Sequence, residues 1–199
     1  MPSGRTHDRV TLWSLPVVAA LTFGQTRSGL LTLIISGGFL LGGLMFGPDL
    51  DIYSRQYQRW GWFRWIWRPY QDSLRHRAFL SHGPLIGTAL RMVYFGIWIA
   101  VFAILALTIA QFFGDMASLR QWLMLQIARS FTQYYREWIA LYIGLELGAM
   151  SHSLMDWGGS AYKRLKKQGW RAFLTPTVNI KMKKRKTKST TRSKGKKLP

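Results

Sequence analysis

The sequence predicts an all-α protein: a membrane-embedded bundle of about four main helices, followed by a disordered basic tail. Hydrophobic residues make up 48% of the 199 residues and gather in four apolar stretches, one of which is uncharged over the length of a membrane span. The chain carries 28 Lys and Arg against 8 Asp and Glu, and 15 of the basic residues fall between positions 163 and 197, where no acidic residue occurs. The end of the chain is therefore a charged segment outside the apolar core.

The apolar stretches are the expected helices, over residues 10–23, 30–47, 85–113 and 138–150. The third includes 92–113 without a charged residue, which matches the roughly 20 residues that a helix needs to cross the hydrocarbon layer. The second is uncharged and rich in glycine, which suits close contact between helices in lipid. Pro16 interrupts the first and Glu146 lies in the fourth, so each of these two could span the membrane, insert halfway or lie in a protein core.

We expect two parts, a helical membrane-associated domain over residues 1–174 and a Lys/Arg-rich tail over 175–199. The tail has almost no apolar residues and should be disordered and attach to anionic lipid, with an acidic partner, RNA or DNA as alternatives. Between the second and third stretches, six arginines alternate with Trp, Tyr and Phe. Such a segment could stack on bases, but beside two apolar stretches it more simply predicts an interfacial belt at the lipid headgroups.

The chain contains no cysteine, so any metal must be held by imidazole and carboxylate groups. His152 and Asp156 lie one helical turn apart and share a helix face. Asp49 and Asp51 share a direction if their segment is extended. Taken alone, each of these residues is more often a helix cap or a hydrogen-bonded polar group than a metal ligand.

Topology strengthens the metal hypothesis. If the four stretches are antiparallel helices, the histidines and their neighbouring acids all fall at one end of the bundle, and they would form the metal site: His7, Asp49, Asp51, His76, His82, His152 and Asp156. A hairpin of the first two stretches would return to the same end. The six-arginine segment and the basic tail share it too, so the positive-inside tendency places this end in the cytoplasm.

These groups exceed the four ligands of one structural zinc and predict one to three divalent ions, zinc first, with manganese, iron or nickel as alternatives. A bound ion would generate hydroxide for attack on a phosphorus or carbonyl centre. Asp51 and Asp8 are candidates for orienting that water or supporting an imidazole. Nearby arginines could neutralise a phosphate, or face lipid headgroups instead: Arg55, Arg75 and Arg77.

Glu146 is a separate case, because a carboxylate in an apolar stretch needs a partner. Arg91 lies at a comparable depth in the third stretch. We expect an ion pair between these two residues, with metal ligation by Glu146 as the alternative.

The segments PSGRTHDRVTLWSLP, GGLMFGPDLDIYSRQYQRWGWFRWIWRPY, SLRHRAFLSHGP and SHSLMDW together resemble predicted metal-binding membrane proteins common in cyanobacteria, a group of unknown function. The similarity covers about residues 2–160. The layout is more distantly similar to inner-membrane metal-dependent hydrolases and to the zinc-dependent phospholipase C and single-strand nuclease superfamily. A second His-x-x-x-Asp pair of the soluble three-zinc enzymes is missing, so the resemblance implies a site of one or two ions.

Two functions remain open at the level of sequence. The first is a metal-dependent hydrolase of a phosphoester or lipid-like substrate at the cytoplasmic membrane face. The second is a non-catalytic membrane protein with a structural or sensory metal site, whose tail docks anionic lipid, an acidic partner or nucleic acid.

Overall fold

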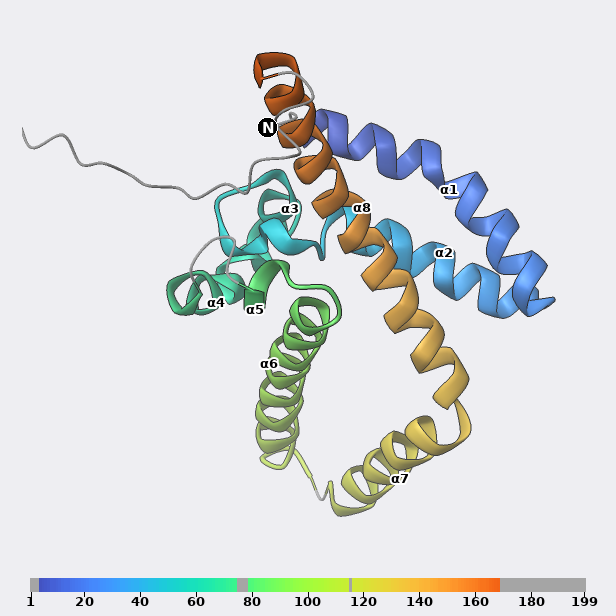
Figure 1. Cartoon of the computed structure of the whole chain (residues 1–199). Helices are drawn as coiled ribbons and strands as arrows, with labels where there is room; N and C mark the ends of the chain where they lie inside the picture. The colour runs from blue at the N-terminus through green and yellow to red at the C-terminus, as the bar shows by residue number, and fades with distance from the viewer. Residues whose placement is uncertain (1–3, 75–78, 115, 169–199) are drawn as a thin grey trace, which may run out of the picture. The chain divides into compact units, whose positions relative to one another are not determined.

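The computed structural model describes residues 4–74, 79–114 and 116–168. The chain divides into two units, Met1–Lys163 and Arg164–Pro199, and the candidate site lies in the first. The expected tail over 175–199 lies outside the described residues. The described part is all helical, as predicted, with these elements in order: α1 (Gly4–Thr26), α2 (Gly29–Leu44), the 3-10 helix η1 (Pro48–Asp51), α3 (Arg55–Gln58), the 3-10 helix η2 (Gly61–Trp67), α4 (Arg68–Ser73), α5 (Phe79–His82), α6 (Ile86–Ala110), α7 (Ala117–Gln133) and α8 (Tyr135–Gln168) (Figure 1).

Helices α1 and α2 form an antiparallel hairpin (Figure 1). The turn places Arg27 at a positive φ of 51°, and the Ser28 side chain then caps α2 by accepting a hydrogen bond from the Leu31 N–H. Near the open end of the hairpin the helices touch, because a Cβ on Gly43 would lie 2.6 Å from the Thr11 side chain. This contact brings the start of α1 beside the end of α2.

Helix α8 crosses α2 at glycines of both helices. A Cβ on Gly42 would lie 2.3 Å from the Leu145 carbonyl oxygen, and one on Gly148 would lie 2.3 Å from the Phe39 carbonyl oxygen. No side chain fits between backbones at that distance. The close helix contact expected from the glycines of the second apolar stretch is confirmed, with α8 as the partner.

The aromatic segment after α2 is only partly an exposed belt. Trp67 is completely buried and its ring meets Phe46 edge-on and stacks on Phe95 of α6, so it forms the core that joins η2 to α6. Trp62 and Phe63 are exposed over 82% and 55% of their surfaces. The segment thus has an exposed aromatic part, Trp62 to Trp65, followed by buried aromatic residues at the end of η2 and in α4. The interfacial belt stays a prediction for the exposed part.

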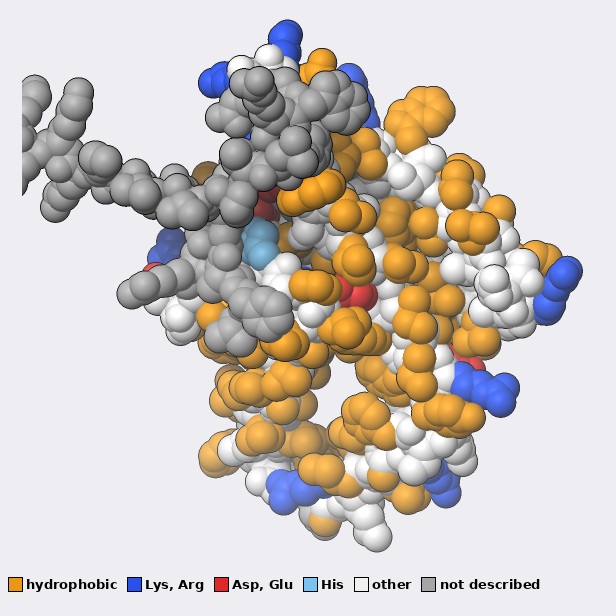
Figure 2. All heavy atoms as spheres, viewed as in Figure 1, with side chains coloured by type: hydrophobic (Ala, Val, Ile, Leu, Met, Phe, Trp, Pro, Cys, Tyr) orange, Lys and Arg blue, Asp and Glu red, His pale blue; other side chains and the backbone are white. Residues whose placement is uncertain are grey.

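Two segments are long and apolar enough to cross a membrane, Gly29–Asp51 and Ile86–Ala110. In the apolar window of the second, none of the residues is buried, and Figure 2 shows hydrophobic side chains over α6. The corresponding exposed residues include Val93, Ile97, Phe102 and Ile104.

The number of helices differs from the four expected. Helix α7 lies between the third and fourth apolar stretches, where arginines and glutamines interrupt any apolar run. Helix α8 continues beyond residue 150 to Gln168, since the polar residues that end the apolar stretch are compatible with a helix and include no proline.

Candidate metal centre

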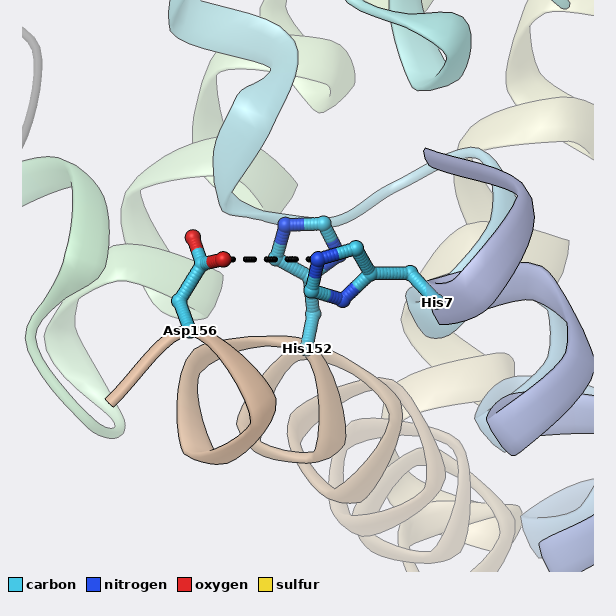
Figure 3. A group of neighbouring side chains, drawn as sticks. All are labelled: His7, His152 and Asp156. Carbon is cyan, nitrogen blue, oxygen red and sulfur yellow. Dashed lines mark ion pairs between the residues drawn. The ribbon is translucent and has the colours of Figure 1, made fainter. Parts of the chain in front are cut away.

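Three predicted ligands meet where the start of α1 passes α8. His7 comes from α1, and His152 and Asp156 come from successive turns of α8 (Figure 3). One donor atom from each residue lies within 4.8 Å of the other two. His7 Nε2 is 3.3 Å from Asp156 Oδ1, and the two imidazole rings stack with centroids 3.9 Å apart. The first turn of α1 and the C-terminal half of α8 thus form one cluster of donors.

Helix η1 contributes two carboxylates that lie near His152 and His82. Asp49 Oδ2 lies 3.0 Å from His152 Nε2, and Asp49 Oδ1 lies 3.7 Å from His82 Nε2. Asp51 Oδ2 lies 3.6 Å from His82 Nδ1. The Asp49 carboxylate therefore links the histidine of α8 to the histidine at the end of α5.

Local structure fixes Asp49. Pro48 starts η1, whose tight turns place Asp49 and Asp51 near His82 without the extended conformation that the sequence analysis assumed. The Asp49 N–H donates to the Gln56 side-chain oxygen at 3.2 Å, and the Ser54 hydroxyl donates to the Asp49 carbonyl at 2.7 Å.

Gln56 is a site residue that the sequence analysis missed. It is buried, with 4% exposure. Its Nε2 donates to the Gly43 carbonyl at 3.0 Å and lies 3.4 Å from His152 Nδ1. One amide thus connects the end of α2, the backbone of Asp49 and the ring of His152. A single glutamine among arginines and aromatic residues carries no spacing signal that could have identified it.

The environment of His7 favours the neutral imidazole. Burial lowers the pKa of His7, and the neighbouring His152 lowers it further, while Asp156 and Asp49 act in the opposite direction. Neutral imidazole is the form that binds metal. His7 Nδ1 is buried and has no hydrogen-bond partner among the residues that the structure describes.

The donor set fits a divalent ion. Ligand bonds of 2.0–2.2 Å in a tetrahedral zinc site place neighbouring donors about 3.4 Å apart. The nitrogen–oxygen separations in the cluster are 3.0, 3.3, 3.6 and 3.7 Å. A small cavity of about 20 Å³, lined in part by His7, Asp49 and His152, adjoins these donors. His7, His152 and Asp156 could hold one ion. Asp49, which lies near both His152 and His82, could support that ion.

Asp8 lines the same small cavity as His7 and Asp49, but its carboxylate is engaged by arginines. Asp8 is paired with Arg55 at 2.9 Å and with Arg59 through both guanidinium nitrogens at 2.9 and 2.7 Å. Both oxygens of Asp8 and the guanidinium of Arg55 are thus engaged in ion pairs. His76, together with Arg75 and Arg77, lies outside the described residues.

The prediction of an ion pair between Arg91 and Glu146 is wrong. Arg91 donates to the Ser81 carbonyl and the Thr88 hydroxyl, whereas a Glu146 oxygen accepts from the Leu85 N–H. Each side chain is instead engaged by groups near the start of α6: Arg91 by the Ser81 carbonyl of α5 and the Thr88 hydroxyl, and Glu146 by the Leu85 N–H.

Comparisons with known proteins support metal binding. The sequence model of the family described as uncharacterized metal-binding protein (DUF2227) matches residues 2–166. An uncharacterized protein of Aquifex aeolicus (strain VF5) is 38% identical over 58 residues, which cover 29% of this chain and 40% of that protein. No solved structure matches. All candidate ligands fall within the family match, and the chain belongs to the DUF2227 family of uncharacterized metal-binding proteins.

Proposed function

We propose that this chain is an integral membrane protein whose histidine–aspartate cluster binds divalent metal, zinc first, and hydrolyses a phosphoester or lipid-like substrate. The observation that carries the proposal is the meeting of imidazole and carboxylate groups from α1, η1, α5 and α8 in one cluster, with separations of 3.0 to 3.7 Å. The distant likeness of the motif layout to metal-dependent hydrolases of membranes and to zinc-dependent phospholipases supports the same reaction class.

The residues of the cluster would have different roles in hydrolysis. A bound divalent ion would supply a coordinated water whose pKa is near 7. Asp49 holds the His152 and His82 rings through its two oxygens, and Gln56 holds Asp49 through its backbone. Asp51 has a fully buried side chain near His82, where a carboxylate can accept a proton from an attacking water.

Membrane placement is part of the proposal. The unburied apolar surface of Ile86–Ala110 would be costly in water and favourable in lipid. The exposed Trp62 and Phe63, next to Arg64, suit the headgroup layer. The basic segments favour an orientation with the metal centre on the cytoplasmic side, and anionic lipid is the proposed partner of the tail over 175–199.

A non-catalytic metal site is the second candidate. It is favoured by the size of the cavity beside His7 and His152, which at about 20 Å³ has room for one ion or water and little else. A structural ion would raise the melting temperature strongly, since binding free energy adds to folding free energy. Thermal melting in detergent with zinc and with EDTA separates this candidate from a catalytic ion, which can leave folding nearly unchanged.

Hydrolysis assays test the enzyme directly. Detergent-purified protein loaded with zinc or manganese is incubated with bis(p-nitrophenyl) phosphate, p-nitrophenyl phosphate and p-nitrophenyl acetate. We expect hydrolysis of a phosphoester that falls about 100-fold or more in Asp49→Asn. The matched control is Asp72→Asn, an exposed carboxylate on α4. Metal-loaded protein that cleaves none of the substrates would contradict the hydrolase and leave the non-catalytic site.

A further inference from the structure

A second cavity adjoins the metal centre. It has a volume of about 210 Å³ and lies between the turn before α6, the first turns of α6 and the middle of α8. His82 is shared by the cavity and the metal centre, because it lines the cavity and lies near Asp49 and Asp51. Pro48, directly before Asp49, lines the cavity as well. A molecule in the cavity would therefore reach the metal centre from the His82 side.

The cavity contains two buried charged side chains that do not neutralise each other by contact. Arg91 and Glu146 both line it, with exposures of 1% and 6%. Arg91 Nε and Glu146 Oε2 are buried and lack hydrogen-bond partners among the described residues. A buried charged group with unsatisfied hydrogen-bonding capacity is costly. Two residues that line the cavity thus each carry a buried polar atom without a hydrogen-bond partner among the described residues.

The remaining wall is apolar and reaches the surface. Met150, Leu154 and Trp157 line the cavity from α8, and Leu154 and Trp157 are exposed over 58% and 65% of their surfaces. These two residues form a rim of apolar side chains. The cavity also adjoins the start of α6, whose apolar side chains are exposed along the helix.

The volume limits what can enter. About 210 Å³ corresponds to roughly seven water molecules at about 30 Å³ each, which is enough for a glycerol-sized group but not for an acyl chain. A larger ligand must leave its apolar part outside, against the rim and α6. A small polar ligand would fill the cavity but gain nothing from the apolar rim.

We propose that this cavity binds the glycerol-ester part of a phospholipid-like amphiphile. The phosphate faces His82 and the metal centre, an ester carbonyl oxygen accepts from Arg91 Nε, a hydroxyl of the polar headgroup beyond the phosphate donates to Glu146 Oε2, and the alkyl chains lie over Leu154, Trp157 and α6. The inference rests on the proposed function, because it identifies the substrate class of that same metal centre. This inference differs from the proposed function because it requires the protein to bind lipid even when it holds no metal.

The test measures binding apart from catalysis. Metal-free protein, treated with EDTA in detergent, is titrated with dihexanoylphosphatidylglycerol and with glycerophosphoglycerol, its headgroup without chains, and binding is followed by native mass spectrometry. We expect the lipid to bind at least about tenfold more tightly than the headgroup, since burial of a few methylene groups alone provides that difference.

Two variants locate the bound lipid. Ser153→Phe places a ring in the cavity, because Ser153 lines it. Glu146→Gln keeps the side-chain oxygen that accepts from Leu85 and removes the charged acceptor. We expect each to weaken lipid binding about tenfold, the effect of one hydrogen bond to a charged group or of a blocked cavity. Ser160→Phe, at an exposed position of α8 outside the cavity, should bind lipid like the wild type.

The outcomes separate the two proposals. Equal lipid binding by the wild type, Ser153→Phe and Glu146→Gln would overturn the cavity as the lipid site, as would equal binding of lipid and headgroup. Lipid binding that is lost in both variants, while metal-loaded protein cleaves no phosphoester, would support the cavity and overturn the hydrolase.

Discussion

The imidazole rings of His7 and His152 stack with centroids 3.9 Å apart and an angle of 23° between their planes. One residue lies in the first turns of the first helix and the other far along α8. Each ring also faces a carboxylate, Asp156 for His7 and Asp49 for His152. Stacked imidazoles between carboxylates form a site prepared for a cation, because their nitrogens and the carboxylate oxygens already lie close together.

Gln56 should control the metal centre without being a ligand. Gln56→Ala removes the contacts to Gly43, to the Asp49 N–H and to His152. We expect metal affinity to fall about 10-fold to 100-fold, the usual cost of losing a supporting hydrogen bond. Competition with a zinc-binding dye measures the affinity. Gln58→Ala, at an exposed position of the same short helix, is the control, and equal affinity in both variants would remove Gln56 from the site.

The glycine contact between α2 and α8 should position His152, which lies one turn after Gly148 in α8. Gly148→Ala places a Cβ 2.3 Å from the Phe39 carbonyl oxygen, so α8 must move away. We expect a loss of about 1–3 kcal/mol in stability together with weaker metal binding, measured by melting and metal content. Gly158→Ala, where a Cβ meets nothing within 4 Å, should be neutral or slightly stabilising. Equal effects of both substitutions would refute a positioning role for the contact.

The stability of the metal-free protein should depend on pH through His7. The pKa of His7 is lowered from its ordinary value of 6.5, chiefly by burial. The unfolded chain therefore binds a proton at a pH where the folded chain does not, and the free energy of unfolding falls as the pH drops from 6.5 toward the lower folded pKa. Thermal melting in EDTA across this range should show the decrease. His7→Gln should lose this component, and an unchanged pH profile in that variant would contradict the assignment.

Asp8 should matter for stability rather than for metal. Asp8→Asn breaks the pairing with Arg55 and Arg59, and these partly exposed pairs stabilise a fold by about 1 kcal/mol or less. We expect a small decrease in melting temperature and unchanged metal content. Loss of metal in Asp8→Asn would instead support the role as a water-orienting or supporting group that the sequence suggested.

The sequence predicted the helical class and the two most apolar helices, because length and absence of charge alone determine such segments. It also anticipated that His7, Asp49, His82 and Asp156 would meet, since this depends only on chain direction and not on exact helix ends. The structure brings these four residues together in linked pairs. Their role as ligands stays a prediction.

The contacts of individual side chains could not be predicted from the sequence. Arg91 of α6 meets the Ser81 carbonyl of α5, and Glu146 of α8 meets the Leu85 N–H before α6, and no spacing rule predicts which partner each side chain reaches. Gln56 could not be predicted either, because a single glutamine among arginines and aromatic residues gives no spacing signal. Helix α7 was missed because its polar and apolar residues form no uninterrupted run, and the sequence analysis had treated such runs as the sign of a helix.

The most direct test of the central claim is the metal content of detergent-purified protein, measured by inductively coupled plasma mass spectrometry. Wild type is compared with His152→Ala, Asp49→Ala and the exposed control Asp72→Ala. We predict at least one divalent ion per chain in the wild type and in the control, and a loss of most of it in the other two. Equal metal content in all four proteins would show that these side chains do not form the binding site.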